Sequence, residues 1–205
     1  MPVTLEQLLQ SREERVQHQT DLLGTHPGTS LLCLTVQLPG AEKRTPASLK
    51  IARAGVEAIR QAFLPEFEEL RDLETGYEAY FLLSLPPEQV KRRACQLEDT
   101  HPLGRLMDID VLQATACPES LPVVGNYFSQ GFAKNQFPTT STRPTLPITA
   151  VGRADLGLAP RKCLLCGNEV RYCMRAKTHT TAELLNRIEQ MLKEYELQTP
   201  NPRTD

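Results

Sequence analysis

Residues 106–112, which read Leu-Met-Asp-Ile-Asp-Val-Leu, constrain the fold more than any other part of the chain. Large apolar side chains alternate with acidic ones there, and successive side chains of a β-strand point to opposite faces of the sheet. Asp108 and Asp110 therefore share one face, whereas Ile109 and Val111 point to the other. Because the stretch is otherwise hydrophobic, we expect a strand that is buried on at least one side.

The shared face of Asp108 and Asp110 predicts a divalent cation site. Residues two apart on a strand are roughly 7 Å apart at the backbone, so both carboxylates can reach one ion. Mg²⁺ prefers carboxylate oxygens together with substrate phosphate oxygens. Just upstream, Gly104 allows the backbone to approach an anion closely, and Arg105 offers a planar fork that matches phosphate oxygens. The alternative interpretation is an edge strand whose solvated face carries two acids.

Length and charge narrow the class of protein. With 205 residues, 40% of them hydrophobic, the chain is long enough for one substantial core, and we expect a single domain over residues 1–205. A net charge of −2 and a pI near 6.1 argue against nucleic acid as a partner. The sequence has no apolar run of 18 or more residues and no signal-peptide pattern, so we expect a cytoplasmic protein that does not contact a membrane.

Helical and strand-like patterns alternate along the chain. They predict helix 4–23, strand 30–38, helix 45–63, strand 77–85, helix 86–97 and strand 106–112. This order favours an α/β (α+β) fold, with a mixed sheet covered by helices. Thr4 with Gln7 and Thr180 with Glu183 have the spacing of helix caps, and the second pair predicts a C-terminal helix. Residues 114–150 contain only three charged side chains and show no periodicity, so we expect an irregular excursion there.

A cysteine and histidine cluster follows the excursion. Cys163, Cys166, Cys173 and His179 have the spacing C-x2-C-x6-C-x5-H, and three thiolates with one imidazole can close a tetrahedral structural zinc site. The alternative is a set of reduced core cysteines, with His179 near a helix start contacting phosphate or backbone. Basic residues concentrate in the same stretch and suit phosphates beside a helix N-terminus: Arg161, Lys162, Arg171, Arg175 and Lys177.

These patterns together indicate a metal-dependent enzyme that acts on a phosphorylated compound. The paired aspartates would hold Mg²⁺, and the basic groups would hold the phosphate chain. The polar face of the first helix adds Arg12 and Arg15, which by themselves are most simply part of a solvated face with intrahelical charge pairs.

Several stretches resemble one known family. They are His101-Pro-Leu-Gly-Arg-Leu-x-Asp-Ile-Asp-Val-Leu112, Pro160-Arg-Lys-Cys-Leu-Leu-Cys166, Cys173-x-Arg175, Lys177-Thr-His179 and the opening Ser11-Arg-Glu-Glu-Arg15 with Gln19. They are similar to the apo-citrate lyase phosphoribosyl-dephospho-CoA transferases, the CitX family of citrate lyase holo-acyl-carrier-protein synthases. The resemblance covers most of the chain apart from about 114–150, where a long excursion with few charged residues replaces a short connector.

The resemblance implies a nucleotidyltransferase-like fold and activity. The family moves phosphoribosyl-dephospho-CoA from 2'-(5''-triphosphoribosyl)-3'-dephospho-CoA to a serine of the citrate lyase acyl carrier (gamma) subunit and releases diphosphate. The resemblance implies that Asp108, Asp110 and Arg105 are catalytic here, with both aspartates on Mg²⁺. It also implies substrate-binding roles for Gly104, Arg161, Arg175, His179, Arg12 and Arg15.

Two other functions fit the same residues. One is a non-catalytic zinc-binding interaction module that docks on a carrier protein through its cysteine region. The other is a metal-dependent phosphohydrolase that uses water in place of the carrier serine. Diphosphate release without any carrier protein would favour the hydrolase.

Overall fold

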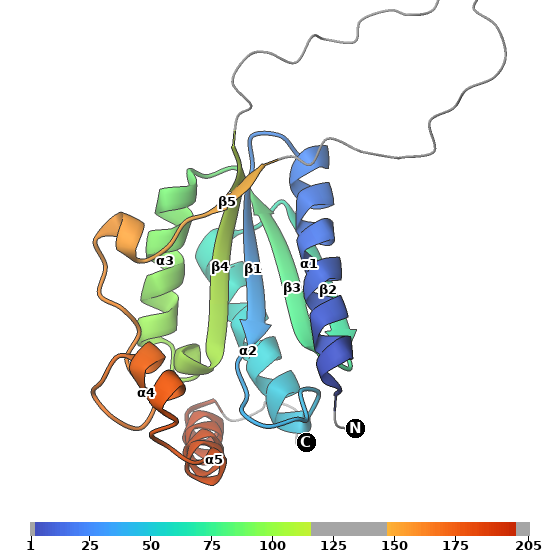
Figure 1. Cartoon of the computed structure of the whole chain (residues 1–205). Helices are drawn as coiled ribbons and strands as arrows, with labels where there is room; N and C mark the ends of the chain where they lie inside the picture. Colours follow the sequence, from blue (N-terminus) through green and yellow to red (C-terminus); the bar gives the residue numbers. More distant parts are fainter. Residues whose placement is uncertain (1–2, 116–146, 200–205) are drawn as a thin grey trace, which may run out of the picture.

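A central antiparallel sheet organises the computed structural model, which describes residues 3–115 and 147–199 (Figure 1). Within them the strand order is β2-β3-β1-β4-β5, with β1 at Ser30–Val36, β2 at Phe67–Leu73, β3 at Gly76–Leu83, β4 at Met107–Ala114 and β5 at Ile148–Ala150. The expected α/β class is confirmed. The expected mixed sheet is wrong, because all four strand pairings are antiparallel. Helix α2 connects β1 to β2, and helix α3 connects β3 to β4. In each case the two connected strands run in the same direction with one antiparallel strand between them, which is the split β-α-β arrangement.

Helices cover the two faces of the sheet unequally. Their bounds are α1 Leu5–Thr25, α2 Pro46–Phe63, α3 Pro87–Thr100, α4 Val170–Ala176 and α5 Thr181–Gln198. Helices α2 and α3 pack on one face together with apolar side chains of α5, and α1 lies on the other (Figure 1). Helix α1 packs on that face through Leu22 and Leu23, near its C-terminal end.

The predicted helix starts are confirmed at both ends of the chain. Thr4 with Gln7 and Thr180 with Glu183 form complete capping boxes, and α2 begins in the same way at Thr45. In each box the threonine hydroxyl and the partner side chain satisfy backbone N–H groups that a helix leaves without a partner. Because these bonds join residues three apart, the sequence alone can reveal them.

Strand β2 was not predicted from the sequence. Four of its seven residues are charged, and its positions alternate between exposed and partly buried. It lies at the edge of the sheet, where a two-residue turn at Glu74-Thr75 joins it to β3. Charged side chains protect an edge strand from pairing with other chains, but they also remove the apolar pattern that identifies a strand.

The predicted excursion is described only at its two ends. Residues 114–115 and 147–150 continue the sheet, because β5 pairs with the last residues of β4. Residues 116–146 lie outside the described residues. In the described part of the chain, no helix combines the length and the apolar character needed to cross a membrane.

Strand β4 has the two faces that its alternating sequence predicts. Ile109 and Val111 are fully buried in the core beneath α2 and α3. Asp108 and Asp110 point to the face of α1, where they stand opposite Thr35 and Cys33 of β1. Both carboxylates therefore lie on one side of the sheet.

The outer edge of β4 is satisfied by side chains of α3 as well as by β5. Strand β5 pairs only with residues 112–114, so the backbone at Ile109 needs other partners. Its N–H donates to Glu98 Oε1 at 3.0 Å, and its carbonyl oxygen accepts from Lys91 Nζ at 2.7 Å. Both side chains are buried, and leaving such a backbone group unpaired would cost about 1–3 kcal/mol. Helix α3 thus braces the strand that carries the two aspartates.

Candidate functional site

Asp108 is held in one orientation by two neighbours. Its Oδ2 accepts from Gln37 Nε2 at 2.9 Å, and its Oδ1 accepts from Arg161 Nη1 at 3.0 Å. The carboxylate is still 35% exposed. Each carboxylate oxygen has a further lone pair, so a fixed and partly exposed Asp108 can still ligate a cation.

Arg161 positions the aspartate strand. Its Nη2 donates to the Met107 carbonyl oxygen at 2.7 Å and to the Arg105 carbonyl oxygen at 3.3 Å, while Nη1 contacts Asp108. These bonds tie the stretch after the excursion to the start of β4. Since both terminal nitrogens are engaged by the protein, Arg161 is placed to orient Asp108 more directly than to bind a phosphate.

Asp110 carries a negative charge that the described residues do not neutralise. Its side chain is exposed and makes no hydrogen bond or ion pair within the described ranges. Partial desolvation, and then the charge of Asp108, raise the pKa of the Asp110 carboxyl, while Lys91 and Arg15 act in the opposite direction. Two carboxylates that repel each other on an open face have the chemistry of a cation site.

Gly104 and Arg105 lie on a short 3-10 turn, η1 (Gly104–Leu106), that leads into β4. The Gly104 N–H donates to the His101 carbonyl oxygen, and a Cβ at this position would lie 2.5 Å from the Glu98 carbonyl oxygen. Glycine is therefore required here by the packing of η1 on α3, and this explanation does not involve an anion. The amide of Gly104 already has a protein partner.

Arg105 is a cation on the turn that leads into the aspartate strand. Its side chain is half-buried, and within the described residues it makes no hydrogen bond or ion pair. Burial, and then the nearby charge of Arg161, lower the pKa of Arg105, so an anion beside it would be stabilised. The structure thus brings an unpaired guanidinium close to the strand that carries Asp108 and Asp110.

Two cavities share Gln37, the residue that donates to Asp108. The larger, called the main groove below, has a volume of about 790 Å³ and is lined by residues of η1, α4, α5 and the segment after β1, including Gln37, Leu38, Lys43, Arg105 and Lys177. The smaller, called the α1 pocket, has a volume of about 350 Å³ and is lined by Arg12, Arg15 and Thr35, among others. Gln37, Leu38 and Lys43 line both cavities. Gln37 donates to Asp108, so one side chain links both cavities to the aspartate strand, although no residue of β4 lines either cavity.

The predicted arginines differ in their surroundings. Arg12 is exposed and lines the α1 pocket, whereas Arg15 donates through Nε to buried Glu78 at 2.7 Å. Glu78 also accepts from the Tyr80 hydroxyl at 2.5 Å. Sequence reasoning missed this pair, although a lone acid in an otherwise apolar strand is a signal that a cation should face it. Arg175 is exposed on α4 and lines neither cavity.

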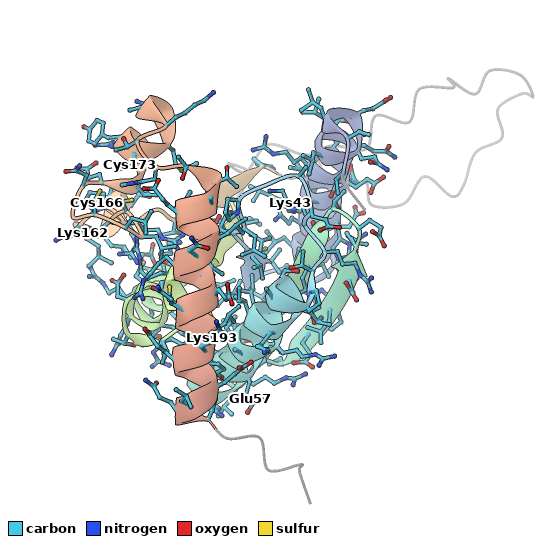
Figure 2. All side chains as sticks on the ribbon, turned by 90° about the horizontal axis from the view of Figure 1, so that it is seen from below. Lys43, Glu57, Lys162, Cys166, Cys173 and Lys193 are labelled. Carbon is cyan, nitrogen blue, oxygen red and sulfur yellow. The ribbon has the colours of Figure 1, made fainter. Side chains whose placement is uncertain are left out.

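The cysteines and the histidine converge as their spacing predicts. The ligand atoms of Cys163, Cys166, Cys173 and His179 all lie within 4.8 Å of one another, with Cys166 Sγ 3.5 Å from Cys173 Sγ and 3.4 Å from His179 Nε2. Figure 2 shows Cys166 and Cys173 together in a lobe beside α5, with Lys43 on the other side of that helix. These four residues could hold a metal ion such as zinc.

Local backbone geometry prepares this cluster for a cation. Burial raises the pKa of Cys163, but hydrogen bonds from the backbone of Leu165 and Cys166, together with those from the thiols of Cys173 and Cys166, lower that pKa to about 7. The Cys163 N–H donates to the Asn168 carbonyl oxygen at 2.7 Å, which closes the tight loop between the first two cysteines and α4. His179 faces Cys166, so its imidazole is placed with the thiols, and it also lines the main groove.

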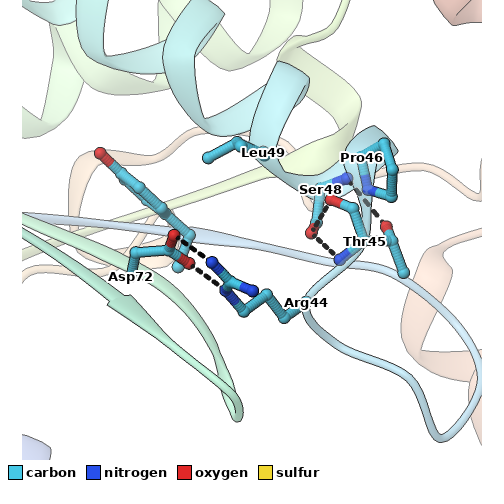
Figure 3. A pocket seen from close by; sticks show the side chains of 7 residues that line it. Arg44, Thr45, Pro46, Ser48, Leu49 and Asp72 are labelled. Atoms are coloured by element: carbon cyan, nitrogen blue, oxygen red, sulfur yellow. Dashed lines mark hydrogen bonds and ion pairs between the residues drawn. The ribbon is translucent and has the colours of Figure 1, made fainter. Parts of the chain in front are cut away.

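A third cavity does not belong to this site. It has a volume of about 250 Å³ at the start of α2 (Figure 3). Arg44, its cation, already donates two hydrogen bonds to Asp72, at 2.8 and 2.9 Å. None of the predicted site residues lines it.

Comparisons with known proteins agree with the resemblance. The family model described as apo-citrate lyase phosphoribosyl-dephospho-CoA transferase matches residues 3–120 and 145–195. A protein of that name from Escherichia coli O1:K1 is 32% identical over 199 residues, which cover 95% of this chain and 91% of the relative. A protein from Streptococcus pyogenes serotype M18, named probable apo-citrate lyase phosphoribosyl-dephospho-CoA transferase, is 32% identical over 196 residues, which cover 94% of this chain and 87% of the relative.

A third relative is longer than this chain. It is the protein CitXG of Haemophilus influenzae, which is 30% identical over 199 residues that cover 95% of this chain and 36% of that protein. The matched regions contain the aspartate strand, Arg105, Arg161 and the cysteine cluster. The chain therefore belongs to the apo-citrate lyase phosphoribosyl-dephospho-CoA transferase family.

Proposed function

We propose that this protein transfers phosphoribosyl-dephospho-CoA from 2'-(5''-triphosphoribosyl)-3'-dephospho-CoA to a serine of the citrate lyase acyl carrier (gamma) subunit, and releases diphosphate. The observation that carries the proposal is that Asp108 and Asp110 share one face of β4 in a chain of this family, and that Gln37, which lines both cavities, donates to Asp108. One cavity can admit the nucleotide, and the other leaves a path for a second reactant. We also propose that residues 1–205 act as a single transferase domain.

In the proposed reaction the serine Oγ attacks the α-phosphorus of the triphosphate, and the bond between the α- and β-phosphoryl groups breaks. The serine proton passes to one of the two carboxylates, and diphosphate leaves with the electrons of the broken bond. Arg105 neutralises negative charge that develops on the leaving diphosphate. Arg161 and Gln37 keep the Asp108 carboxylate in place throughout.

Asp108 and Asp110 are the residues that would hold Mg²⁺. The fit is supported by the uncompensated charge of Asp110 and by the all-oxygen donor set. When bound there, the ion would supply positive charge to the triphosphate oxygens. Arg12, at the rim of the α1 pocket, is a proposed phosphate-binding residue, and Arg175 remains a prediction from the family resemblance.

We infer that the Cys163, Cys166, Cys173 and His179 cluster binds Zn²⁺ in a structural role. Three thiols and an imidazole within 4.8 Å match the donor set and size of a closed tetrahedral site. Such a site would join the loop before α4 to the start of α5 and stabilise the lobe. Five free cysteines among the described residues also suit the reducing cytoplasm that we propose as its compartment.

The zinc proposal predicts about one zinc ion per chain in protein purified without added metal. Removal of the ion by a strong chelator should lower the melting temperature, because a ligand that binds only the folded state stabilises it. A Cys163→Ser variant should contain less zinc and should not respond to the chelator. Metal-free protein that melts at the same temperature as the purified protein would contradict a structural zinc site.

The transfer proposal is tested by intact-mass spectrometry of the apo acyl carrier subunit. The carrier is incubated with this protein, Mg²⁺ and the triphosphate substrate, and diphosphate is measured in parallel. We expect a mass increase equal to one phosphoribosyl-dephospho-CoA group, with diphosphate released only when the carrier is present. Diphosphate release without the carrier would instead identify a hydrolase. Carrier binding without any mass increase would identify the interaction module.

A further inference from the structure

The composition of the main groove is unusual for a site that binds phosphate alone. Its walls are largely apolar, with Leu38, Leu164, Met174 and Leu184 among the lining residues. A volume of about 790 Å³ is within the range of cavities that enclose a small organic ligand. A bare phosphate chain would not need an apolar cavity of this size.

Three cations stand among these apolar walls. Lys43, Arg105 and Lys177 line the groove and come from three separate segments of the chain. Lys43 Nζ donates to the Leu38 carbonyl oxygen, whereas Arg105 has no partner within the described residues. No acidic side chain lines the groove in the part of the chain that the structure describes. The groove therefore suits a ligand that is both anionic and apolar along its length.

We propose that the main groove binds the 3'-dephospho-CoA portion of the substrate, with its diphosphate facing the cations and its adenine and pantetheine groups against the apolar walls. This inference rests on the proposed function, since that function supplies the ligand. Gln37 lines the groove and donates to Asp108, so one side chain links the groove to the aspartate strand. The α1 pocket, at about 350 Å³, then stays open for the carrier serine.

The lobe that holds the cysteines is part of this binding site. Cys163 and Cys173 line the groove, and so do Leu164 between the first two cysteines and Met174 after the third. The loop that the cluster closes is thus one wall of the groove, and the N-terminal half of α5 is another. Figure 2 shows this arrangement from below, with the cysteine lobe and Lys43 on the two sides of α5.

The test measures binding of 3'-dephospho-CoA to the purified full-length protein by isothermal titration calorimetry. This compound lacks the triphosphate and cannot react, so the measurement does not depend on transfer. Two variants place a negative charge in the groove, Met174→Glu and Leu184→Glu. Leu185→Glu is the matched control, because Leu185 is the next residue of α5, is 44% exposed and does not line the groove.

We expect wild-type protein and Leu185→Glu to bind 3'-dephospho-CoA with equal affinity, and each groove variant to bind at least tenfold more weakly. Circular dichroism will show whether the variants are folded, and Met174 is 71% exposed, so its replacement should not disturb the core. The assignment of the groove to 3'-dephospho-CoA would be overturned if the groove variants bound this compound as tightly as the wild type. It would also be overturned if Leu185→Glu lost as much affinity as the groove variants. Wild-type protein that transfers the group while showing no affinity for 3'-dephospho-CoA would overturn it and leave the transferase function standing.

Discussion

Replacing Gly104 with alanine should destabilise the protein strongly, although it adds only one methyl group. A Cβ built at this position lies 2.5 Å from the Glu98 carbonyl oxygen and 2.7 Å from the Leu97 carbonyl oxygen. Both contacts are shorter than a carbon and an oxygen can tolerate, and both partners are backbone atoms of α3 that cannot rotate away. Either η1 or the end of α3 must therefore move.

The expected cost can be stated from this geometry. Adding a methyl group to a packed interior costs about 1–3 kcal/mol, and two backbone clashes place Gly104→Ala near the upper value. In a chain of this size 1 kcal/mol shifts the melting temperature by roughly 2–4 °C, so we expect a decrease of roughly 6–12 °C. Thermal unfolding followed by circular dichroism at 222 nm measures this directly.

Gly24 provides the matched control for the same chemical change. It lies in α1, and a Cβ there would meet nothing within 4 Å. Gly24→Ala should be neutral or raise stability by about 0.5–1 kcal/mol, because alanine loses less backbone entropy in a helix. A Gly104→Ala protein that melts with the wild type but binds substrate more weakly would refute the packing argument. That result would favour the role that the sequence first suggested, close approach of the backbone to an anion.

Two further predictions concern the aspartate strand. Arg161→Lys keeps the positive charge but loses at least two of the three hydrogen bonds to Asp108, Met107 and Arg105. We therefore expect the free energy of unfolding to fall by about 1–3 kcal/mol, as measured by urea unfolding. Transfer, measured by the mass assay, should also be slower. An unchanged unfolding midpoint would contradict the positioning role. Because partial desolvation and the charge of Asp108 raise the pKa of Asp110 in the folded protein, ionisation of Asp110 opposes folding as the pH rises through that pKa. Metal-free Asp110→Asn should thus have a higher melting temperature than the wild type at pH 7. This difference should disappear below about pH 4, near the ordinary pKa of aspartate. A lower melting temperature than the wild type at pH 7 would show that Asp110 has a stabilising partner.

The features that could be predicted from the sequence are those set by near neighbours. The capping boxes at Thr4 and Thr180 join residues three apart, and the shared face of Asp108 and Asp110 follows from the alternation of side chains along one strand. The cysteine cluster was also predicted, because metal ligands keep characteristic spacings even when the loop between them is irregular.

The features that could not be predicted depend on contacts between distant residues. Arg161 was expected to bind phosphate, but the structure pairs it with Asp108, which lies 53 residues away in the chain. The brace that Glu98 and Lys91 form at Ile109 depends on how α3 packs against β4, which no local pattern encodes. The direction of each strand pairing depends in the same way on where the helical crossovers place the strands.

The most direct test of the account is transfer to the acyl carrier subunit by the Asp110→Asn variant, followed by intact-mass spectrometry of the carrier. Asp21→Asn is the matched control, because Asp21 is an exposed aspartate on α1 whose carboxylate accepts a hydrogen bond from Gln17 of the same helix. If Asp110 helps to hold the cation at the triphosphate, folded Asp110→Asn should transfer the group at least about a hundredfold more slowly than the wild type, while Asp21→Asn should match it. Transfer at the wild-type rate by folded Asp110→Asn would contradict the central claim that the paired aspartates form the catalytic site.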